Sequence, residues 1–210
     1  MPAEVEVRYV SLDAAPRLRE LGGFLSADER ERAARFRFDR DRDRFIVCRG
    51  SLRELLAARL RIAPAGVRFV YGSFGKPAIE DPEIRFNVSH SHGMAMIAVT
   101  RGREVGCDIE RIDPSFAGEK IPELFFSPYE VATLRALPIA DQCEAFFRCW
   151  TRKEAYIKAC GLGVSLALDS FDVTLAPDQP AALLRGADGW SFWGIDAPPA
   201  GHAAAVVIAD

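Results

Sequence analysis

Two short stretches carry acidic and basic side chains at spacings that suit phosphate chemistry. In GCDIE, Asp108 and Glu110 alternate along an expected strand, so both carboxylates project to one face. In WTRKEAYIKAC, Glu154 and Lys158 lie four residues apart, on one side of an expected helix. Brought together, these carboxylates would suit a hard divalent cation, Mg²⁺ first, beside phosphate oxygens. Each pair taken alone also fits an ordinary exposed surface.

Lysine is scarce in this chain. Only four of its 27 basic residues are lysine, and two of them, Lys153 and Lys158, flank Glu154. An ammonium is a compact donor whose pKa can be lowered, whereas a guanidinium stays charged near neutrality. Our hypothesis is that the lysines are kept here because one of them moves a proton.

A third group of polar side chains lies in FGKPAI and FNVSHSHG. Lys76 sits in a glycine-rich turn, and Ser89 and His90 lie near the end of an expected strand. A lysine, a hydroxyl and an imidazole beside loop amides form a cradle for phosphate. A lone lysine or histidine is more often structural, and His92 is interpreted as incidental.

Composition limits the classes of protein to consider. At 210 residues the chain can form one sizeable core or two small joined halves, and no apolar run approaches the roughly 18 residues of a membrane span. The first ten residues do not resemble a signal peptide. Five cysteines without a CxxC pair indicate reduced thiols. A cytoplasmic protein without a membrane partner is expected.

Charge is unevenly distributed along the chain. Residues 1–105 carry a balance of +4 and residues 106–210 a balance of −7. The basic excess peaks at residues 30–53, where aspartates alternate with arginines, so most of it is interpreted as an ion-paired helix face. Because the whole chain is acidic and lacks a basic aromatic platform, nucleic acid is not an expected partner.

Periodicity predicts alternating helices and strands of an α+β protein with mainly antiparallel sheet. Ser26 with Glu29, and Ser127 with Glu130, are the capping boxes that open two of the helices. Helices are expected at 26–38, 41–62, 127–137 and 141–160, and strands at 5–12, 67–71, 84–100 (a hairpin), 104–113, 169–175, 190–196 and 202–209.

GKP, FNVSHS, VGCDIE and WTRKEAYIKACGLGVSL, in this order and at these separations, resemble the 4′-phosphopantetheinyl transferase superfamily. The length and the complete Asp-x-Glu are similar to the monomeric, surfactin-synthetase-activating (Sfp-like) type. The resemblance implies two similar halves, each a mainly antiparallel sheet packed on helices. We expect an N-terminal half over residues 1–105, with the coenzyme A phosphate contacts, and a C-terminal half over 106–210, with the metal and catalytic residues. The site would lie between them.

The resemblance also implies a reaction and a set of roles. Such enzymes move the 4′-phosphopantetheine arm of coenzyme A to a serine of an apo acyl or peptidyl carrier protein and release 3′,5′-ADP. Asp108, Glu110 and Glu154 would bind Mg²⁺, with Mn²⁺ as a substitute, and Asp108, Glu154 and Lys158 would be catalytic. The positions implied to contact coenzyme A are Arg32, Arg44, Arg49, Lys76, Ser89, His90, Lys153 and Lys158.

Three positions depart from the family pattern. Glu29 and Phe45 stand where similar enzymes often have a lysine and a hydroxyl residue that grip the 3′-phosphate, and His92 replaces a small residue. The general base, Glu154 or a metal-bound water, stays open, as do the carrier and the pathway. Two alternatives also stay open: a Mg²⁺-dependent hydrolase of a nucleotide pyrophosphate, and a non-catalytic carrier-binding protein.

Overall fold

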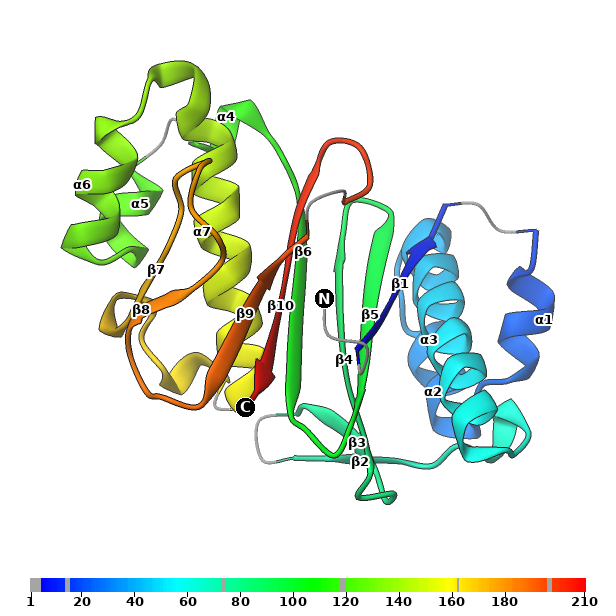
Figure 1. Ribbon diagram of the computed structural model, residues 1–210. Helices are drawn as coiled ribbons and strands as arrows, with labels where there is room; N and C mark the ends of the chain where they lie inside the picture. Colours follow the sequence, from blue (N-terminus) through cyan, green and yellow to red (C-terminus); the bar gives the residue numbers. More distant parts are fainter. Residues whose placement is uncertain (1–4, 14–15, 73–74, 118–119, 162, 196–197) are drawn as a thin grey trace.

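Two three-stranded antiparallel sheets form the centre of the molecule, and helices cover their outer sides (Figure 1). The computed structural model describes residues 5–13, 16–72, 75–117, 120–161, 163–195 and 198–210. The first sheet has the order β1-β5-β4 and the second β6-β10-β9. The predicted α+β class is confirmed. The strands are β1 (Glu6–Ser11), β4 (Ile84–Ser91), β5 (Met94–Arg101), β6 (Val105–Arg111), β9 (Trp190–Gly194) and β10 (His202–Ala209).

Strands β4 and β6 lie side by side, but polar side chains rather than a backbone ladder join them. Alternate residues of β4 point across this seam. Asn87 Oδ1 accepts a hydrogen bond from the Cys107 amide at 2.9 Å, Ser89 Oγ donates to Asp108 at 2.7 Å, and Ser91 Oγ donates to Glu110 at 2.6 Å. The FNVSHS sequence is therefore the polar edge that holds the two sheets together.

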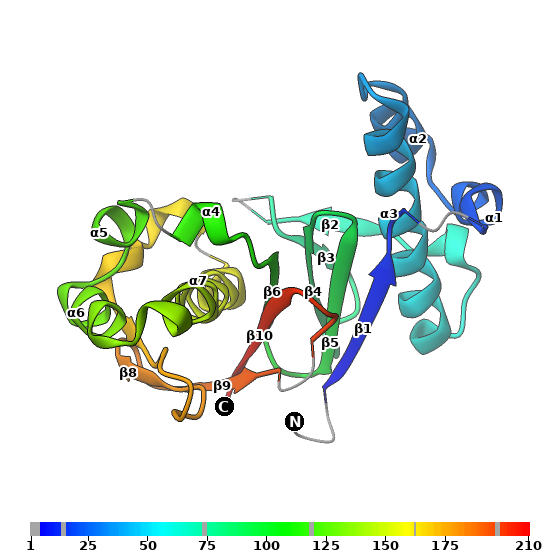
Figure 2. The same cartoon turned by 90° about the horizontal axis from the view of Figure 1, so that it is seen from above.

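The N-terminal helices pack beside the first sheet, as Figure 2 shows from above. They are α1 (Leu18–Gly23), α2 (Ala27–Ala34) and α3 (Asp39–Leu60). The predicted capping box of Ser26 and Glu29 opens α2, and Glu29 is buried because it also binds Arg53 of α3 at 2.6 Å. Aliphatic residues of α3 pack on β4 and β5 to form the core of this half.

The C-terminal helices cover the second sheet. They are α4 (Pro114–Ala117), α5 (Ile121–Phe125), α6 (Pro128–Ala136) and α7 (Ile139–Cys160). Ser127 and Glu130 form the predicted capping box of α6. Helix α7 ends where Gly161 adopts a left-handed φ of 69°, as a helix C-terminus favours. Two short hairpins, β2 (Phe69–Tyr71) with β3 (Pro77–Ile79) and β7 (Asp172–Val173) with β8 (Leu183–Arg185), complete the fold.

Helix α7 approaches strand β6 very closely, and Gly106 makes this possible. A Cβ at Gly106 would overlap the carbonyl oxygen of Ala155 and the amide nitrogen of Ala159. Because strand side chains alternate, Gly106 and Asp108 share the face that meets α7, whereas Cys107 is buried on the opposite face. Residues of α7 thereby come within reach of the β6 carboxylates.

Within the described part of the chain, none of the helices is both long and apolar enough to cross a membrane. All five cysteines belong to this part and are free thiols.

Candidate active site

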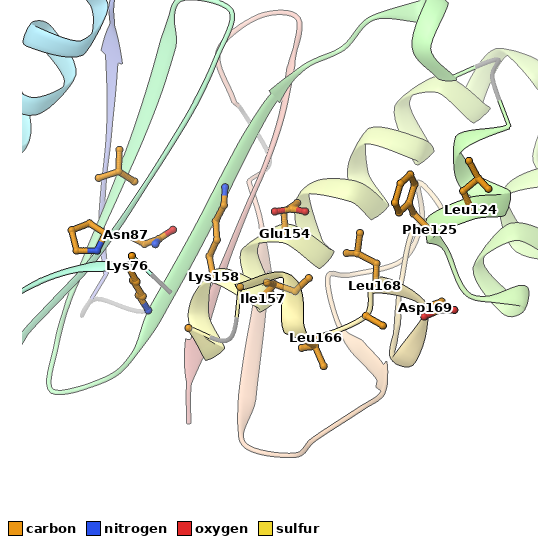
Figure 3. Close-up of a pocket in the computed structure, with 16 residues that line it drawn as sticks. Lys76, Asn87, Leu124, Phe125, Glu154, Ile157, Lys158, Leu166, Leu168 and Asp169 are labelled. Carbon is orange, nitrogen blue, oxygen red and sulfur yellow. The ribbon is translucent and has the colours of Figure 1, made fainter. Parts of the chain in front are cut away.

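A cavity of about 580 Å³ lies between α7, α5 and the seam; we call it the lysine cavity (Figure 3). Glu154 and Lys158 of α7 line it, and Leu124 and Phe125 of α5 line its other side. The remaining residues that line it are Gly75, Lys76, Pro77, Asn87, Val88, Ile157, Gly161, Gly163, Leu166, Ala167, Leu168 and Asp169.

Lys158 joins the two sheets at the floor of this region. Its ammonium donates to Asp108 Oδ1 at 2.5 Å and to Ser89 Oγ at 3.0 Å, and Ser89 donates to the same Asp108 oxygen. Burial alone would lower the pKa of Lys158, but the attraction and hydrogen bond of Asp108 outweigh it, so the pKa is raised. The lysine is therefore protonated near neutrality. This corrects the sequence-based idea of a lysine whose pKa is lowered.

The two other carboxylates have raised pKa values. Burial is the main cause at Glu154, and the negative charge of Asp108 adds to it. Burial also dominates at Glu110, where the hydrogen bond from Ser91 works in the opposite direction. Because each of these two carboxyl groups feels the charge of Asp108, the three predicted ligands are electrostatic neighbours.

The chemistry of this donor set fits a hard cation, but its arrangement is not a closed ligand shell. Asp108 Oδ2 is buried and has no hydrogen-bond partner among the described residues. In the same part of the chain, no group of three or more His, Cys, Asp or Glu side chains is arranged to hold a metal ion. The positive charge beside Asp108 is supplied by Lys158. Carboxylate oxygens are the ligand type that Mg²⁺ prefers, but among the described residues these three carboxylates do not form a ready-made metal site.

A second cavity, of about 550 Å³, lies between α2, α3 and the β4–β5 turn; we call it the arginine cavity. The structure brings together here four residues that the sequence analysis assigned to coenzyme A: Arg32, Arg44, Arg49 and His90. The guanidinium of Arg49 is mostly buried, and its Nη1 has no hydrogen-bond partner among the described residues. Guanidinium groups in a concave site suit phosphate oxygens.

The lysine and arginine cavities share Gly75, Pro77 and Val88 in their walls, so they are adjoining parts of one groove. Lys76 stands at this junction. Its ammonium is already bound to Glu104 Oε2 at 3.1 Å and to the carbonyl oxygens of Val105 and Ala159. Its aliphatic stem therefore forms part of the wall.

Two residues predicted to contact coenzyme A lie elsewhere. Lys153 is fully buried: its ammonium pairs with Glu130 at 2.8 Å and donates to the carbonyl oxygen of Phe171 at 2.7 Å. An apolar core requires such an ammonium to be paired, so Lys153 is a structural residue and its assignment to the cofactor was wrong. Ser89 is also buried, and it binds Asp108 and Lys158 across the seam without lining either cavity.

The departures from the family pattern have structural reasons. Glu29 faces inward, where it pairs with Arg53 at 2.6 Å and lies 3.5 Å from Arg49 Nε, so its charge is directed at these arginines. Phe45 lines the arginine cavity, packs against Phe36 in a tilted arrangement with ring centroids 5.5 Å apart and lies beneath the Arg32 guanidinium. An aromatic wall thus replaces a hydroxyl.

The sequence analysis missed three residues of the site. Asn87 and Ser91 could have been found from their alternation with Ser89 on one strand, but their partners on β6 required the fold. Asp13 could not have been found, because only the structure brings it to Arg44. Phe125 of α5 is 42% exposed at the edge of the lysine cavity, although its sequence context alone does not distinguish a site residue from a core residue.

Comparison with known proteins identifies the family of this chain. Residues 15–101 match a family model described as 4′-phosphopantetheinyl transferase, N-terminal, and residues 104–207 match one for the 4′-phosphopantetheinyl transferase superfamily. The chain is 40% identical over 194 residues to the 4′-phosphopantetheinyl transferase HetI of Nostoc sp., which covers 90% of this chain and 81% of that protein.

The chain is also 35% identical over 161 residues to the 4′-phosphopantetheinyl transferase Sfp of Bacillus subtilis, which covers 76% of this chain and 70% of that protein. Among solved structures, the ACPS–CoA complex of Chronobacterium ammoniagenes matches 50% of this chain and 95% of that one at 19% identity and a TM-score of 0.38. From the family models and the sequence relatives, the chain belongs to the 4′-phosphopantetheinyl transferase superfamily.

Proposed function

We propose that this protein transfers the 4′-phosphopantetheine group of coenzyme A to a serine hydroxyl of an apo carrier protein and releases 3′,5′-ADP. One observation carries the proposal: Lys158 and Glu154 line a cavity that adjoins an arginine-lined one. Coenzyme A carries a pyrophosphate and a separate 3′-phosphate, so it requires two positive regions. Membership of the family supports the same reaction.

We assign the 3′-phosphate to Arg32, Arg44, Arg49 and His90, and the pyrophosphate to the region of Lys158. The serine oxygen of the carrier forms a new bond to the phosphorus next to pantetheine, and the bond from that phosphorus to the bridging oxygen breaks. Charge then collects on the departing nucleotide, where the protonated Lys158 stabilises it. Lys76 would contribute only if it left its present partners.

Glu154 is our choice for the general base. Its carboxyl lines the lysine cavity, and its raised pKa makes it a better proton acceptor than an ordinary surface glutamate. The serine proton would pass to one of its oxygens as the hydroxyl attacks.

We further propose that Mg²⁺, or Mn²⁺ in its place, is held by Asp108, Glu110 and Glu154. The buried, unpartnered Oδ2 of Asp108 and the all-oxygen donor set support this. When bound, the cation would neutralise charge on the pyrophosphate oxygens. Lys158 occupies Asp108 Oδ1, so a cation would share Asp108 with it or take its position.

The arginine-rich surface of α2 and α3 is complementary in charge to an acidic carrier protein. Its positive electrostatic potential would steer the carrier to the site. We propose that the enzyme acts as a monomer in the cytoplasm, since the described residues of one chain line both cavities.

The experiment that tests the function incubates the protein with coenzyme A, Mg²⁺ and an apo carrier, and then weighs the carrier. A gain of the phosphopantetheine mass supports transfer. Hydrolysed coenzyme A with an unmodified carrier would favour a pyrophosphate hydrolase, and carrier binding without chemistry would favour a non-catalytic protein. Glu154→Gln is the matched inactive variant.

A further inference from the structure

Arg44 of the arginine cavity is held by a carboxylate from another part of the chain. Asp13, which follows β1, accepts from Arg44 Nε at 2.6 Å on Oδ1 and from Arg44 Nη2 at 2.9 Å on Oδ2. This is the two-pronged geometry with which a guanidinium also binds a phosphate. The donors that a phosphate would use on Arg44 are therefore already engaged.

The backbone around Asp13 is built to keep the carboxylate at this point. The Leu12 amide donates to the Gly93 carbonyl at 2.7 Å, which fixes the segment against the β4–β5 turn. Gly93 has a left-handed φ of 85°, and a Cβ there would overlap Asp13 Oδ2 and crowd Arg44 Nη2. A glycine at this turn thus leaves the space that the ion pair fills.

The ion pair is asymmetric in its exposure. The Asp13 side chain is 55% exposed, whereas that of Arg44 is 24% exposed and borders the cavity. The carboxylate can turn toward water at little cost, because exposed ion pairs contribute little to stability. Arg44 would remain at the cavity wall to meet an incoming anion.

We infer that Asp13 is a specificity-determining residue that occupies Arg44 as an internal anion and yields it to the 3′-phosphate of coenzyme A. Nucleotides without the 3′-phosphate do not displace Asp13 and gain nothing from Arg44. The cavity is thereby kept from binding weaker anions, and coenzyme A binds less tightly than the arginines alone would allow. This inference rests on the proposed function.

The test compares dissociation constants measured by calorimetry for the wild type, Asp13→Asn, Arg44→Gln and the double variant. Asp13→Asn is expected to bind coenzyme A about two- to fivefold more tightly. It should bind dephospho-coenzyme A, which lacks the 3′-phosphate, as the wild type does. The double variant should match Arg44→Gln, because Asp13 acts only through that guanidinium.

Asp41→Asn is the matched control for charge. Asp41 also lines the arginine cavity, but it pairs with Arg40 and accepts no hydrogen bond from Arg44. Its effect on binding measures the general gain from removing one negative charge, and Asp13→Asn must exceed it. Asp13→Ala, which lacks the amide that could still bind Arg44, should equal or exceed Asp13→Asn.

Equal or weaker binding of coenzyme A by both Asp13 variants would overturn the inference, since Asp13 would then orient Arg44 rather than compete for it. Inorganic pyrophosphate is the second probe. If the wild type failed to bind coenzyme A, the proposed function would fall, while tighter pyrophosphate binding by Asp13→Asn would still support competition at Arg44. Binding of neither probe to any variant would overturn both.

Discussion

The Lys158 ammonium group contacts side chains of both central sheets. Its ammonium fits between Asp108 of β6 and Ser89 of β4, with both partners within 3.0 Å. A guanidinium is planar and larger, and it could not sit between the two oxygens without moving one of them. We therefore attribute the presence of lysine at this position to the size and shape of its ammonium group. The raised pKa of Lys158 means that this group stays positively charged near neutrality.

We expect Lys158→Arg to lower kcat for transfer by about 100-fold while the dissociation constant for coenzyme A changes little. The reason is that the positive charge is kept but its position relative to Asp108 is lost. Steady-state transfer kinetics and calorimetry measure the two quantities. Lys120→Arg, at an exposed position, is the matched control; near-normal turnover of Lys158→Arg would contradict this account.

Glu154 carries a stability cost that depends on pH. Its folded-state pKa lies above the usual 4.5, so the folded protein disfavours the ionised form and loses stability as pH rises from about 4.5 through the raised pKa. Glu154→Gln should therefore raise the melting temperature at pH 7.5 in EDTA, and the gain should vanish below pH 4.5. Thermal unfolding of both proteins across this range measures it. A lower melting temperature of Glu154→Gln than of the wild type at pH 7.5 would contradict this prediction, because the ionised Glu154 carboxylate would then stabilise the folded protein.

At the scale of elements, the contact of α7 with β6 decides where the α7 side chains lie. Gly106 is the residue that allows it, because the backbone of α7 occupies the space of a side chain. We expect Gly106→Ala to cost about 3 kcal/mol of unfolding free energy and most of the activity, since α7 must move away from Asp108. Urea unfolding and the transfer assay measure both effects.

Gly23→Ala is the matched control for this change, because a Cβ at Gly23 meets no atom within 4 Å. It should leave stability within about 1 kcal/mol of the wild type and activity unchanged. A Gly106→Ala protein as stable as this control would mean that the helix can shift without harm.

Much of this element pattern could be predicted from the sequence, and the exceptions have physical causes. The long helices α3 and α7 and the capping boxes at Ser26 and Ser127 carry strong local signals. Helices α1 and α5 and strands β3 and β8 are only three to six residues long, too short for a periodic pattern. Lys153 was misassigned because its burial is set by Glu130, which its position in the motif does not reveal.

At the scale of the whole molecule, the site depends on how firmly the two sheets are joined. Asn87 is buried in the seam and accepts the amide hydrogen of Cys107. We expect Asn87→Ala to cost about 1–3 kcal/mol, because the amide is left buried without an acceptor. Activity should fall as well, since the same seam sets Asp108 against Ser89.

Thr100→Val is the control for Asn87→Ala. It removes a hydrogen bond of a buried side chain to the backbone, from Thr100 Oγ1 to the Arg103 carbonyl, which is not one of the bonds between β4 and β6. Stability should fall in both variants, but only Asn87→Ala should lower the activity per folded molecule. Equal activity in the two would mean that the seam does not govern the geometry of the site.

The groove formed by the two adjoining cavities has a consequence for the end of the catalytic cycle. On the proposed assignment, the nucleotide left behind still carries the 3′-phosphate that the arginine cavity would bind, while the phosphopantetheine arm has departed on the carrier. We therefore expect escape of 3′,5′-ADP, rather than bond breaking, to limit the steady rate. A rapid first turnover followed by a slower phase, with the slow phase quickened by added salt, would be its kinetic signature.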